Sequence, residues 1–470
     1  MRRNTYCLLQ MMAGVALAFA LVCGAQTPAA PAATVVPAAT TASNTAPASN
    51  EAILKELAEM KARIAQLEAE LKARGSNATD ADRDASALRS ANPAGGKKSD
   101  APTPPEQAKS APATPVWSVG PMEISGFIDG YYSYNANRPA DTIDGASGNQ
   151  TNGLYNFNDK TDQFNLSAAK LTLNHDPDPV GAHIDLLFGR TDTLVNGPSS
   201  ADNGKYIEQA FISLKPHTAK GLELDFGKFV SSAGAEVIES KDNWNYSRSL
   251  LFVSAIPYFH FGLRSSLPVS KTETIGMQVV NGWNNVSNSN GGVIVGLTSA
   301  YVKPKYAWNV NYYTGPANAN TQKGYRNLID TTLLLTPTTK FSAYINYDYG
   351  QNRDAVSPAA SSSTNNKLLN HWQGVAFAAR QQITAKSALA GRFEYFNDPQ
   401  GYTTQMKTKP QVDEFTATYE YKWPEGLLAR LEYRRDWADV DLYTKGNTLL
   451  AVKDQSTVTA GFVAFFGPKR

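Results

Sequence analysis

The chain has 470 residues, with 18 % charged and 10 % aromatic side chains and a formal net charge of +2. This near-neutral balance gives no electrostatic reason to expect nucleic acid or another polyanion as a partner. The mean hydropathy of −0.35 excludes a bundle of transmembrane helices, because each such helix needs about 20 mostly apolar residues. It is compatible with membrane-spanning strands, in which polar side chains alternate with apolar ones.

The first 25 residues predict a secretory signal peptide. An apolar run from Leu8 to Val22 follows two arginines, and Cys23 and Ala25 occupy the −3 and −1 positions of a cleavage site. A membrane anchor and lipoprotein processing at Cys23 are the alternatives, although the run is short for an anchor and the residues before Cys23 fit a lipobox poorly. Cleavage after Ala25 removes both cysteines of the chain, and with them any disulfide or thiolate metal site.

Residues 26–49 are rich in Ala, Pro and Thr and predict an extended linker. Residues 50–74 predict a short periplasmic helix, and residues 75–116 lack periodicity and predict a disordered tether. The apolar residues of the helix are spaced alternately by four and three positions, which is typical of a coiled-coil seam: Ile53, Leu57, Met60, Ile64, Leu67 and Leu71. Self-association is the expected role of this seam, and a single helix lying on the rest of the protein or on a membrane is the alternative.

From residue 117 to the C-terminus, strands with alternating apolar and polar residues dominate the pattern. In residues 427–434 one phase is Leu, Ala, Leu and Tyr, whereas the other carries Arg430, Glu432 and Arg434. Successive strand side chains point to opposite faces, so one face is apolar and the other ionic. We expect no helices that could cover the apolar face. The pattern therefore predicts a closed barrel with lipid outside and water inside, and a soluble β-sandwich is an alternative.

Seven short turns and eight long connections divide this region and predict about sixteen strands. The short turns fall near residues 176–179, 216–221, 268–271, 303–305, 336–340, 384–386 and 423–426. The long connections fall near residues 135–160, 191–204, 231–255, 284–292, 314–324, 350–369, 398–407 and 439–453. The predicted fold class is all-β, a transmembrane antiparallel up-and-down β-barrel over residues 117–470. Both of its ends lie on the short-turn side, which in outer-membrane barrels is the periplasmic side.

Five segments of this region form a distinctive series. They are ISGFIDGYY at 124–132, LTL at 171–173 with DPDPVG at 176–181, DFGKF at 225–229, GAEVIESKDNWNYSRS at 234–249 and VNGWN at 280–284. Together they resemble the OmpL-like β-barrel porin-2 family of bacterial outer-membrane proteins, over roughly residues 120–470. The resemblance implies an outer-membrane porin-like barrel but no specific solute. The coiled-coil segment lies outside it and is similar in layout to porins with a periplasmic helix for trimerisation or cell-wall contact.

The third long connection, about residues 231–255, is the most charged and aromatic one. By analogy with sixteen-stranded porins that fold this loop inward, the candidate constriction residues are Glu236, Glu239, Asp242 and Arg248. Inward charges of later strands form a candidate lumenal wall: Arg380, Arg392, Glu394, Arg430, Glu432 and Arg434. An acidic edge opposite a basic wall would set a transverse field that favours small polar or charged solutes. The alternatives are a structural plug for the loop and simple wetting of the lumen for the wall charges.

Tryptophans near the expected strand ends predict aromatic girdles at the membrane interfaces, with sugar stacking as the alternative: Trp117, Trp283, Trp308, Trp372, Trp423 and Trp437. We expect no enzyme activity, because the histidines show no metal-ligand spacing and adjacent acids such as Asp413 and Glu414 point to opposite faces. No cofactor or metal is expected, although a Ca²⁺ ion among the Asp and Asn residues of 141–162 is conceivable.

These observations predict an outer-membrane porin for the passive diffusion of small hydrophilic solutes or ions, with both termini in the periplasm. The expected partners are outer-membrane lipid and further copies of the chain in a homotrimer, together with peptidoglycan or a periplasmic protein reached through the coiled coil. The alternative is a structural outer-membrane anchor with a blocked lumen, which would tether the cell wall or a partner through the coiled coil.

Overall fold

The computed structural model describes residues 118–119, 122–140, 142–143, 146–147, 150–197, 204–355, 369–447 and 451–467. The predicted signal peptide, linker, coiled-coil helix with its seam, and tether lie outside these residues, as does Trp117. Among the described residues, no helix is long and apolar enough to cross a lipid bilayer.

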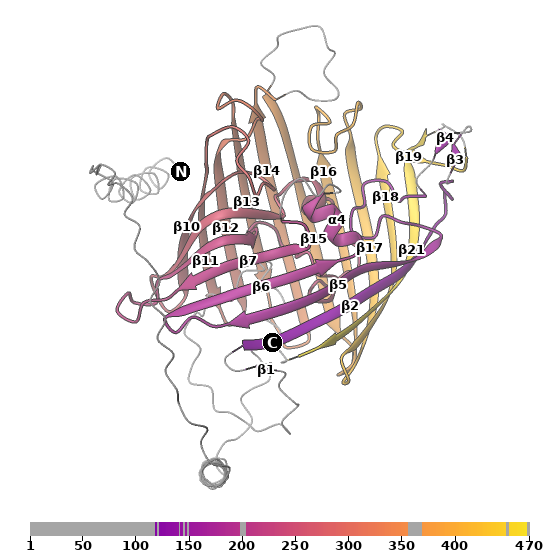
Figure 1. The fold of residues 1–470 in the computed structure, drawn as a ribbon. Coiled ribbons are helices and arrows are strands. Elements are labelled where there is room, and N and C mark those ends of the chain that lie inside the picture. The colour runs from indigo at the N-terminus through magenta and orange to yellow at the C-terminus, as the bar shows by residue number, and fades with distance from the viewer. Residues whose placement is uncertain are drawn as a thin grey trace, which may run out of the picture. The chain divides into compact units, whose positions relative to one another are not determined.

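Sixteen antiparallel strands close into one barrel, in which β2 pairs with both β5 and β21 (Figure 1). The strands are β2 (Met122–Asn135), β5 (Gln163–His175), β6 (Val180–Phe188), β7 (Ile207–Leu214), β8 (Glu223–Val230), β9 (Phe259–Pro268), β10 (Glu273–Val280), β11 (Ile294–Lys303), β12 (Tyr306–Pro316), β13 (Tyr325–Leu335), β14 (Phe341–Arg353), β15 (Leu369–Gln382), β16 (Ser387–Asn397), β17 (Gln411–Trp423), β18 (Leu427–Ala438) and β21 (Asp454–Phe466). A short strand, β1 (Ser118–Val119), extends the sheet beside β2. The predicted number and direction of the barrel strands are confirmed.

The remaining elements lie in the long connections. They are α4 (Arg190–Asn196), the 3₁₀ turn η1 (Ser240–Asp242), α5 (Leu250–Ser254), the pair β3 (Thr142–Ile143) and β4 (Ala146–Ser147), and the pair β19 (Tyr443–Thr444) and β20 (Ala451–Val452). The seven short turns lie within a few residues of their predicted positions; the turn between β11 and β12, for example, is residues 304–305.

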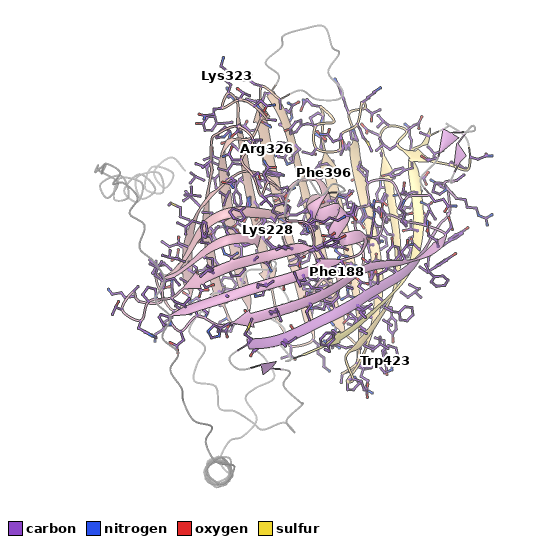
Figure 2. All side chains as sticks on the ribbon, viewed as in Figure 1. Phe188, Lys228, Lys323, Arg326, Phe396 and Trp423 are labelled. Atoms are coloured by element: carbon purple, nitrogen blue, oxygen red, sulfur yellow. The ribbon has the colours of Figure 1, made fainter. Side chains whose placement is uncertain are left out.

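The two phases of each strand face different surroundings, as the alternation predicts. On β18, Leu431 exposes 56 % of its surface on the outer face, whereas the neighbouring Glu432 exposes 2 % on the inner face. Phe188 of β6 is likewise exposed and Phe396 of β16 fully buried, and both are labelled in Figure 2. An outer face rich in exposed Leu, Ile, Phe and Tyr is unfavourable in water and suits lipid hydrocarbon.

The third long connection, residues 231–258 between β8 and β9, is named L3. Its backbone and side chains form hydrogen bonds with inward side chains of ten barrel strands, namely β2, β5, β10 and β12–β18. Glycines of the inner wall make room for it: a methyl group added at Gly461 would overlap the ring of Tyr246. L3 therefore crosses the interior of the barrel.

Apolar side chains anchor the second half of L3. Leu250, Leu251 and Phe252 of α5 are buried in one cluster with wall residues that include Tyr344 and Phe396. Ser249 caps α5 by accepting a hydrogen bond from the Phe252 N–H. Burial of these side chains holds the loop against the wall of β14–β16.

Candidate functional site

Glu236 of L3 and Arg392 of β16 form a buried ion pair at the centre of the site, with Oε1 and Nη1 2.6 Å apart. The Arg392 guanidinium also contacts Glu394 at 2.8 Å and Glu414 at 2.9 Å. The sequence predicts these loop and wall charges opposite one another across water. In the structure they are in direct contact, so this pair contributes little field to a water-filled passage.

Two charged residues of β18 hold the backbone of L3. The Glu432 carboxylate accepts hydrogen bonds from the N–H groups of Tyr246 at 2.5 Å and Ser247 at 2.9 Å. Arg434 donates to the carbonyl oxygen of Arg248 at 2.7 Å. Charge-assisted hydrogen bonds of this kind are stronger than neutral ones, so these wall residues fix the path of the loop.

Arg430 plays a similar part nearer to the short turn that precedes β18. It donates to the carbonyl oxygens of Ser240 and Asn243 in L3 and pairs with Glu420 of β17 at 2.7 Å. Arg380 of β15 pairs with the same Glu420 at 2.8 Å. The predicted wall residues therefore all face inward, but they form a mixed acidic and basic lattice where the sequence analysis expects a basic wall.

Lys170 of β5 ties the other side of L3 to the barrel. Its ammonium group contacts Glu239 of L3, Asp185 of β6 at 2.9 Å and Glu208 of β7 at 2.5 Å. The three carboxylates lie close enough together to suit a metal ion, but the Lys170 ammonium lies among them and supplies the positive charge. Burial raises the pKa of the Glu239 carboxyl, and the attraction of Lys170 more than offsets this, so the net pKa is below its ordinary value.

Asp242 and Arg248, the other two candidate constriction residues, differ in exposure. The Asp242 side chain is half exposed and pairs with Lys241 at 2.5 Å. Arg248 is buried within L3, donates to the Tyr246 carbonyl oxygen at 2.7 Å and lies 4.7 Å from the ring centre of Phe157. Arg248 therefore supports the loop from inside. The sequence-based expectation that it faces the passage is wrong.

Part of the first long connection also packs inside the barrel. The Phe157 ring lies 5.7 Å from that of Phe252 and 5.5 Å from that of Tyr258, between ring centres. Asp159 forms an ion pair with Arg190 at 2.6 Å. This carboxylate belongs to the segment in which a Ca²⁺ ion is conceivable from the sequence, and it is satisfied by an arginine.

The tryptophans divide between the two faces of the barrel. Trp308 and Trp423 are exposed on the outer face, as a membrane girdle requires. Trp372 is fully buried on the inner face and donates from its indole N–H to the carbonyl oxygen of Ala255 in L3 at 2.9 Å. The girdle prediction is wrong for Trp372, because its strand phase places it inside.

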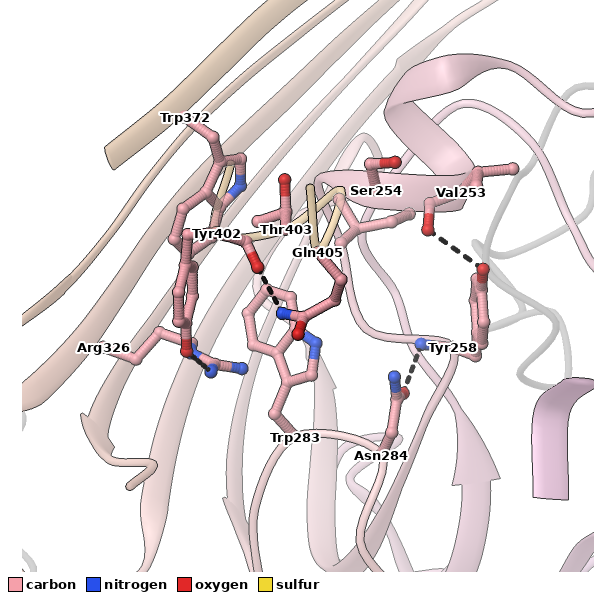
Figure 3. A pocket seen from close by; sticks show the side chains of 11 residues that line it. Val253, Ser254, Tyr258, Trp283, Asn284, Arg326, Trp372, Tyr402, Thr403 and Gln405 are labelled. Carbon is pink, nitrogen blue, oxygen red and sulfur yellow. Dashed lines mark hydrogen bonds between the residues drawn. The ribbon is translucent and has the colours of Figure 1, made fainter. Parts of the chain in front are cut away.

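A cavity of about 200 Å³ lies beside Trp372 at the end of the barrel that carries the long connections (Figure 3). Its lining comes from L3, from the connections after β10 and β16, and from the first residues of β13 and β15: Val253, Ser254, Ile256, Tyr258, Trp283, Asn284, Arg326, Trp372, Tyr402, Thr403 and Gln405. The sequence does not predict this cavity. It does indicate that Trp372 faces the lumen, because Trp372 and Arg380 are eight positions apart on one strand and therefore share a face.

A family model described as "Putative beta-barrel porin-2, OmpL-like" matches residues 121–466. The chain belongs to this porin-2 family. The match includes L3 and every residue that lines the cavity, and it confirms the resemblance seen in the sequence. Together with the apolar outer face, membership of a porin family assigns the barrel to the outer membrane.

Three solved structures illustrate the similarity of fold. Outer-membrane expressed OmpT of Vibrio cholerae has 10 % identity and a TM-score of 0.47, covering 75 % of this chain and 100 % of that one. An anion-selective porin from Comamonas acidovorans has 11 % identity and a TM-score of 0.48, covering 73 % and 99 %. The outer membrane channel DcaP of Acinetobacter baumannii has 14 % identity and a TM-score of 0.47, covering 73 % and 97 %. A comparison with curated proteins found no match. At these identities and scores, no property of the three proteins is transferred to this chain.

Proposed function

We propose that the protein is a passive diffusion pore for small hydrophilic solutes or ions, with L3 as its narrowest part. The observation that carries this proposal is the inner face of a closed sixteen-strand barrel, on which charged residues such as Arg430 and Glu432 replace the apolar residues of the outer face. A barrel of this size is wide enough for water. The proposal requires no covalent chemistry and no energy coupling, in keeping with the expectation that the chain is not an enzyme.

In this proposal the ion pairs between L3 and the wall set the size of the passage. Glu236, Glu239 and the L3 backbone are held by Arg392, Lys170 and Glu432, so the loop is fixed at several points and cannot yield freely to a large solute. Because these charges are buried, discrimination by charge falls to exposed groups such as Asp242. The proposed pore therefore selects mainly by size, with a smaller contribution from charge.

Swelling of liposomes that contain the purified full chain tests the proposal. We expect swelling in isotonic solutions of small sugars, with rates that fall as the solute grows from a pentose to a disaccharide. Liposomes with the same amount of heat-unfolded protein are the control. Swelling no faster than in this control for every solute would contradict a diffusion pore.

A specific observation favours a second candidate, a structural anchor with a blocked lumen. L3 bonds to ten of the strands, and lumenal residues such as Glu394, Glu414 and Asp436 are completely buried. In that case the barrel would hold residues 50–74 near the cell wall or a periplasmic partner. The swelling assay separates the two candidates, because a blocked barrel passes no solute.

We further propose a homotrimer with both ends of the barrel chain on the periplasmic side. The short turns flank both ends of the strand region, and such turns are periplasmic in outer-membrane barrels. The trimer follows from the expected self-association of the coiled-coil seam. Chemical crosslinking of the full chain in vesicles tests it, and a product no larger than one chain would argue against it.

A further inference from the structure

The residues that line the cavity described above include one cationic side chain and no carboxylate. The cation is Arg326, the second residue of β13, and within the described residues it forms no ion pair. Its surroundings differ from those of Arg392 and Arg430, each of which contacts at least one carboxylate. The charge of Arg326 is therefore available to an anion that enters the cavity.

Two hydrogen-bond donors of the cavity wall also lack acceptors in the described part of the chain. The Nε of Arg326 is buried without a partner. The Tyr402 hydroxyl accepts hydrogen bonds from both Arg326 and the amide of Asn352, which leaves its own proton to be donated elsewhere. Buried donors without acceptors are costly, and a ligand that supplies acceptor oxygens would satisfy them.

Aromatic rings form the walls around these donors. The Arg326 guanidinium lies 4.7 Å from the ring centre of Trp283 and 5.6 Å from that of Tyr402. The Trp372 ring lies 5.8 Å from Tyr402 at an interplanar angle of 31° and 6.2 Å from Trp283 at 88°. Figure 3 shows the three rings and Arg326 grouped on one side of the cavity. Flat side chains in this arrangement suit a flat ligand that stacks or meets them edge to face.

We propose that this cavity binds small aromatic carboxylates. The planar guanidinium matches a carboxylate group, the Tyr402 hydroxyl donates to the same group, and the aromatic ring of the ligand lies against Trp283 and Trp372. The volume, about seven times that occupied by a water molecule in the liquid, accommodates a single substituted ring. The inference names a class of solutes for the proposed pore, and to that extent it rests on the proposed function. Binding of the ligand in the cavity does not depend on transport.

A ligand series on the unaltered full chain tests the inference without any risk of misfolding. Isothermal titration calorimetry compares benzoate with benzyl alcohol, which has the ring but no charge, and with acetate, which has the charge but no ring. We expect benzoate to bind at least about tenfold more tightly than either, since hydrogen bonds between charged groups are stronger than neutral ones and only benzoate has both the charge and the ring. Benzyl alcohol or acetate binding as tightly as benzoate, or no benzoate binding at all, would overturn the inference.

The substitution Arg326→Gln identifies the cavity as the place of binding. We expect benzoate affinity to fall at least about tenfold, with little change for benzyl alcohol. The matched control is Arg353→Gln, which removes the same charge from an exposed residue at the end of the neighbouring strand β14 and should leave benzoate binding unchanged. Equal affinity of the Arg326→Gln protein and the unaltered protein for benzoate would overturn the assignment.

Single-channel recording separates this inference from the proposed function. If the protein conducts and benzoate neither binds nor interrupts the current, the pore stands and the binding site is wrong. If benzoate binds in an Arg326-dependent manner and no current is seen, the site stands and the pore is wrong. Benzoate-dependent interruptions that disappear in the Arg326→Gln protein would support both.

Discussion

Glu236 in L3 and Arg392 on β16 lie 2.6 Å apart, and both side chains are almost completely buried. The pair joins the loop to the wall of the barrel across 156 positions of sequence. Glu236 also accepts a hydrogen bond from the Ser249 N–H at 2.6 Å, so one carboxylate holds both the wall and the start of α5. The position of L3 therefore depends on this residue more than on an exposed charge of the same loop.

Replacing Glu236 with Gln should destabilise the folded protein by about 1.5–3 kcal/mol, because the buried Arg392 guanidinium and the Ser249 N–H both lose a hydrogen bond to a charged acceptor. Arg392 retains Glu394 and Glu414, so the protein should still fold. Urea-induced unfolding from lipid vesicles measures the change. Asp242→Asn, the same loss of charge at a half-exposed side chain, should cost less than about 1 kcal/mol. Equal losses of stability in the two variants would contradict the buried link.

For ion selectivity we expect the opposite ranking of the two substitutions, with the larger effect at Asp242. Asp242→Asn should shift the reversal potential in a KCl gradient towards anions, because an exposed charge acts directly on ions in the passage. Glu236→Gln should shift the reversal potential less, since the Glu236 side chain is almost completely buried. Planar-bilayer recordings measure both values under the same gradient. A larger shift for Glu236→Gln would show that the buried carboxylate faces the ions after all.

Lowering the pH should break the ion pair between Glu239 and Lys170 and so loosen this part of L3. Lys170 keeps the pKa of the Glu239 carboxyl below its ordinary value in the folded state, so its contribution is complete above the ordinary glutamate pKa of about 4.3 and is lost as the pH falls through the lower, folded value. An environment-sensitive label on an Asp242→Cys variant should therefore report a change of L3 only below about pH 4.

The control for this titration is the same labelled protein with Glu239→Gln, in which the acid-dependent change should be absent. A label signal that changes between pH 7 and pH 5, or that changes identically in the Glu239→Gln protein, would contradict a role for the contact between Glu239 and Lys170.

A charged side chain on the outer face near the middle of a strand should destabilise the folded barrel in a membrane. Leu431 is 56 % exposed in the middle of β18, and Leu431→Arg should reduce the free energy of folding into vesicles by about 2–4 kcal/mol. Thr339→Arg places the same side chain in the exposed turn between β13 and β14 and should change folding little. Folding titrations in urea compare the variants. A harmless Leu431→Arg would mean that this face does not contact hydrocarbon.

The barrel is predictable from sequence because its signals are local. Alternation along residues 427–434 fixes which side chains face inward, and compact turns such as residues 304–305 fix the strand count. The partners of those inward side chains are not predictable in this way. The contact between Glu236 and Arg392 depends on the path of L3 through the interior, which no local pattern encodes.

The burial of Arg248 was beyond the sequence for a related reason. Its partners are the carbonyl oxygens of Tyr246 and Ile238, and backbone acceptors leave no trace in residue type. Trp372 differs, because its strand phase relative to Arg380 already places it on the inner face. Its position near a strand end suggests a girdle residue, but the phase of the strand decides which face it occupies.

Single-channel conductance of the full chain in planar bilayers tests the central claim most directly, namely that the ionic face of the barrel surrounds a passage for water and ions. We predict discrete current steps of uniform size that grow linearly with voltage and with KCl concentration. Bilayers that contain folded protein, verified by its resistance to urea, yet carry no current steps would contradict the account and favour the blocked anchor.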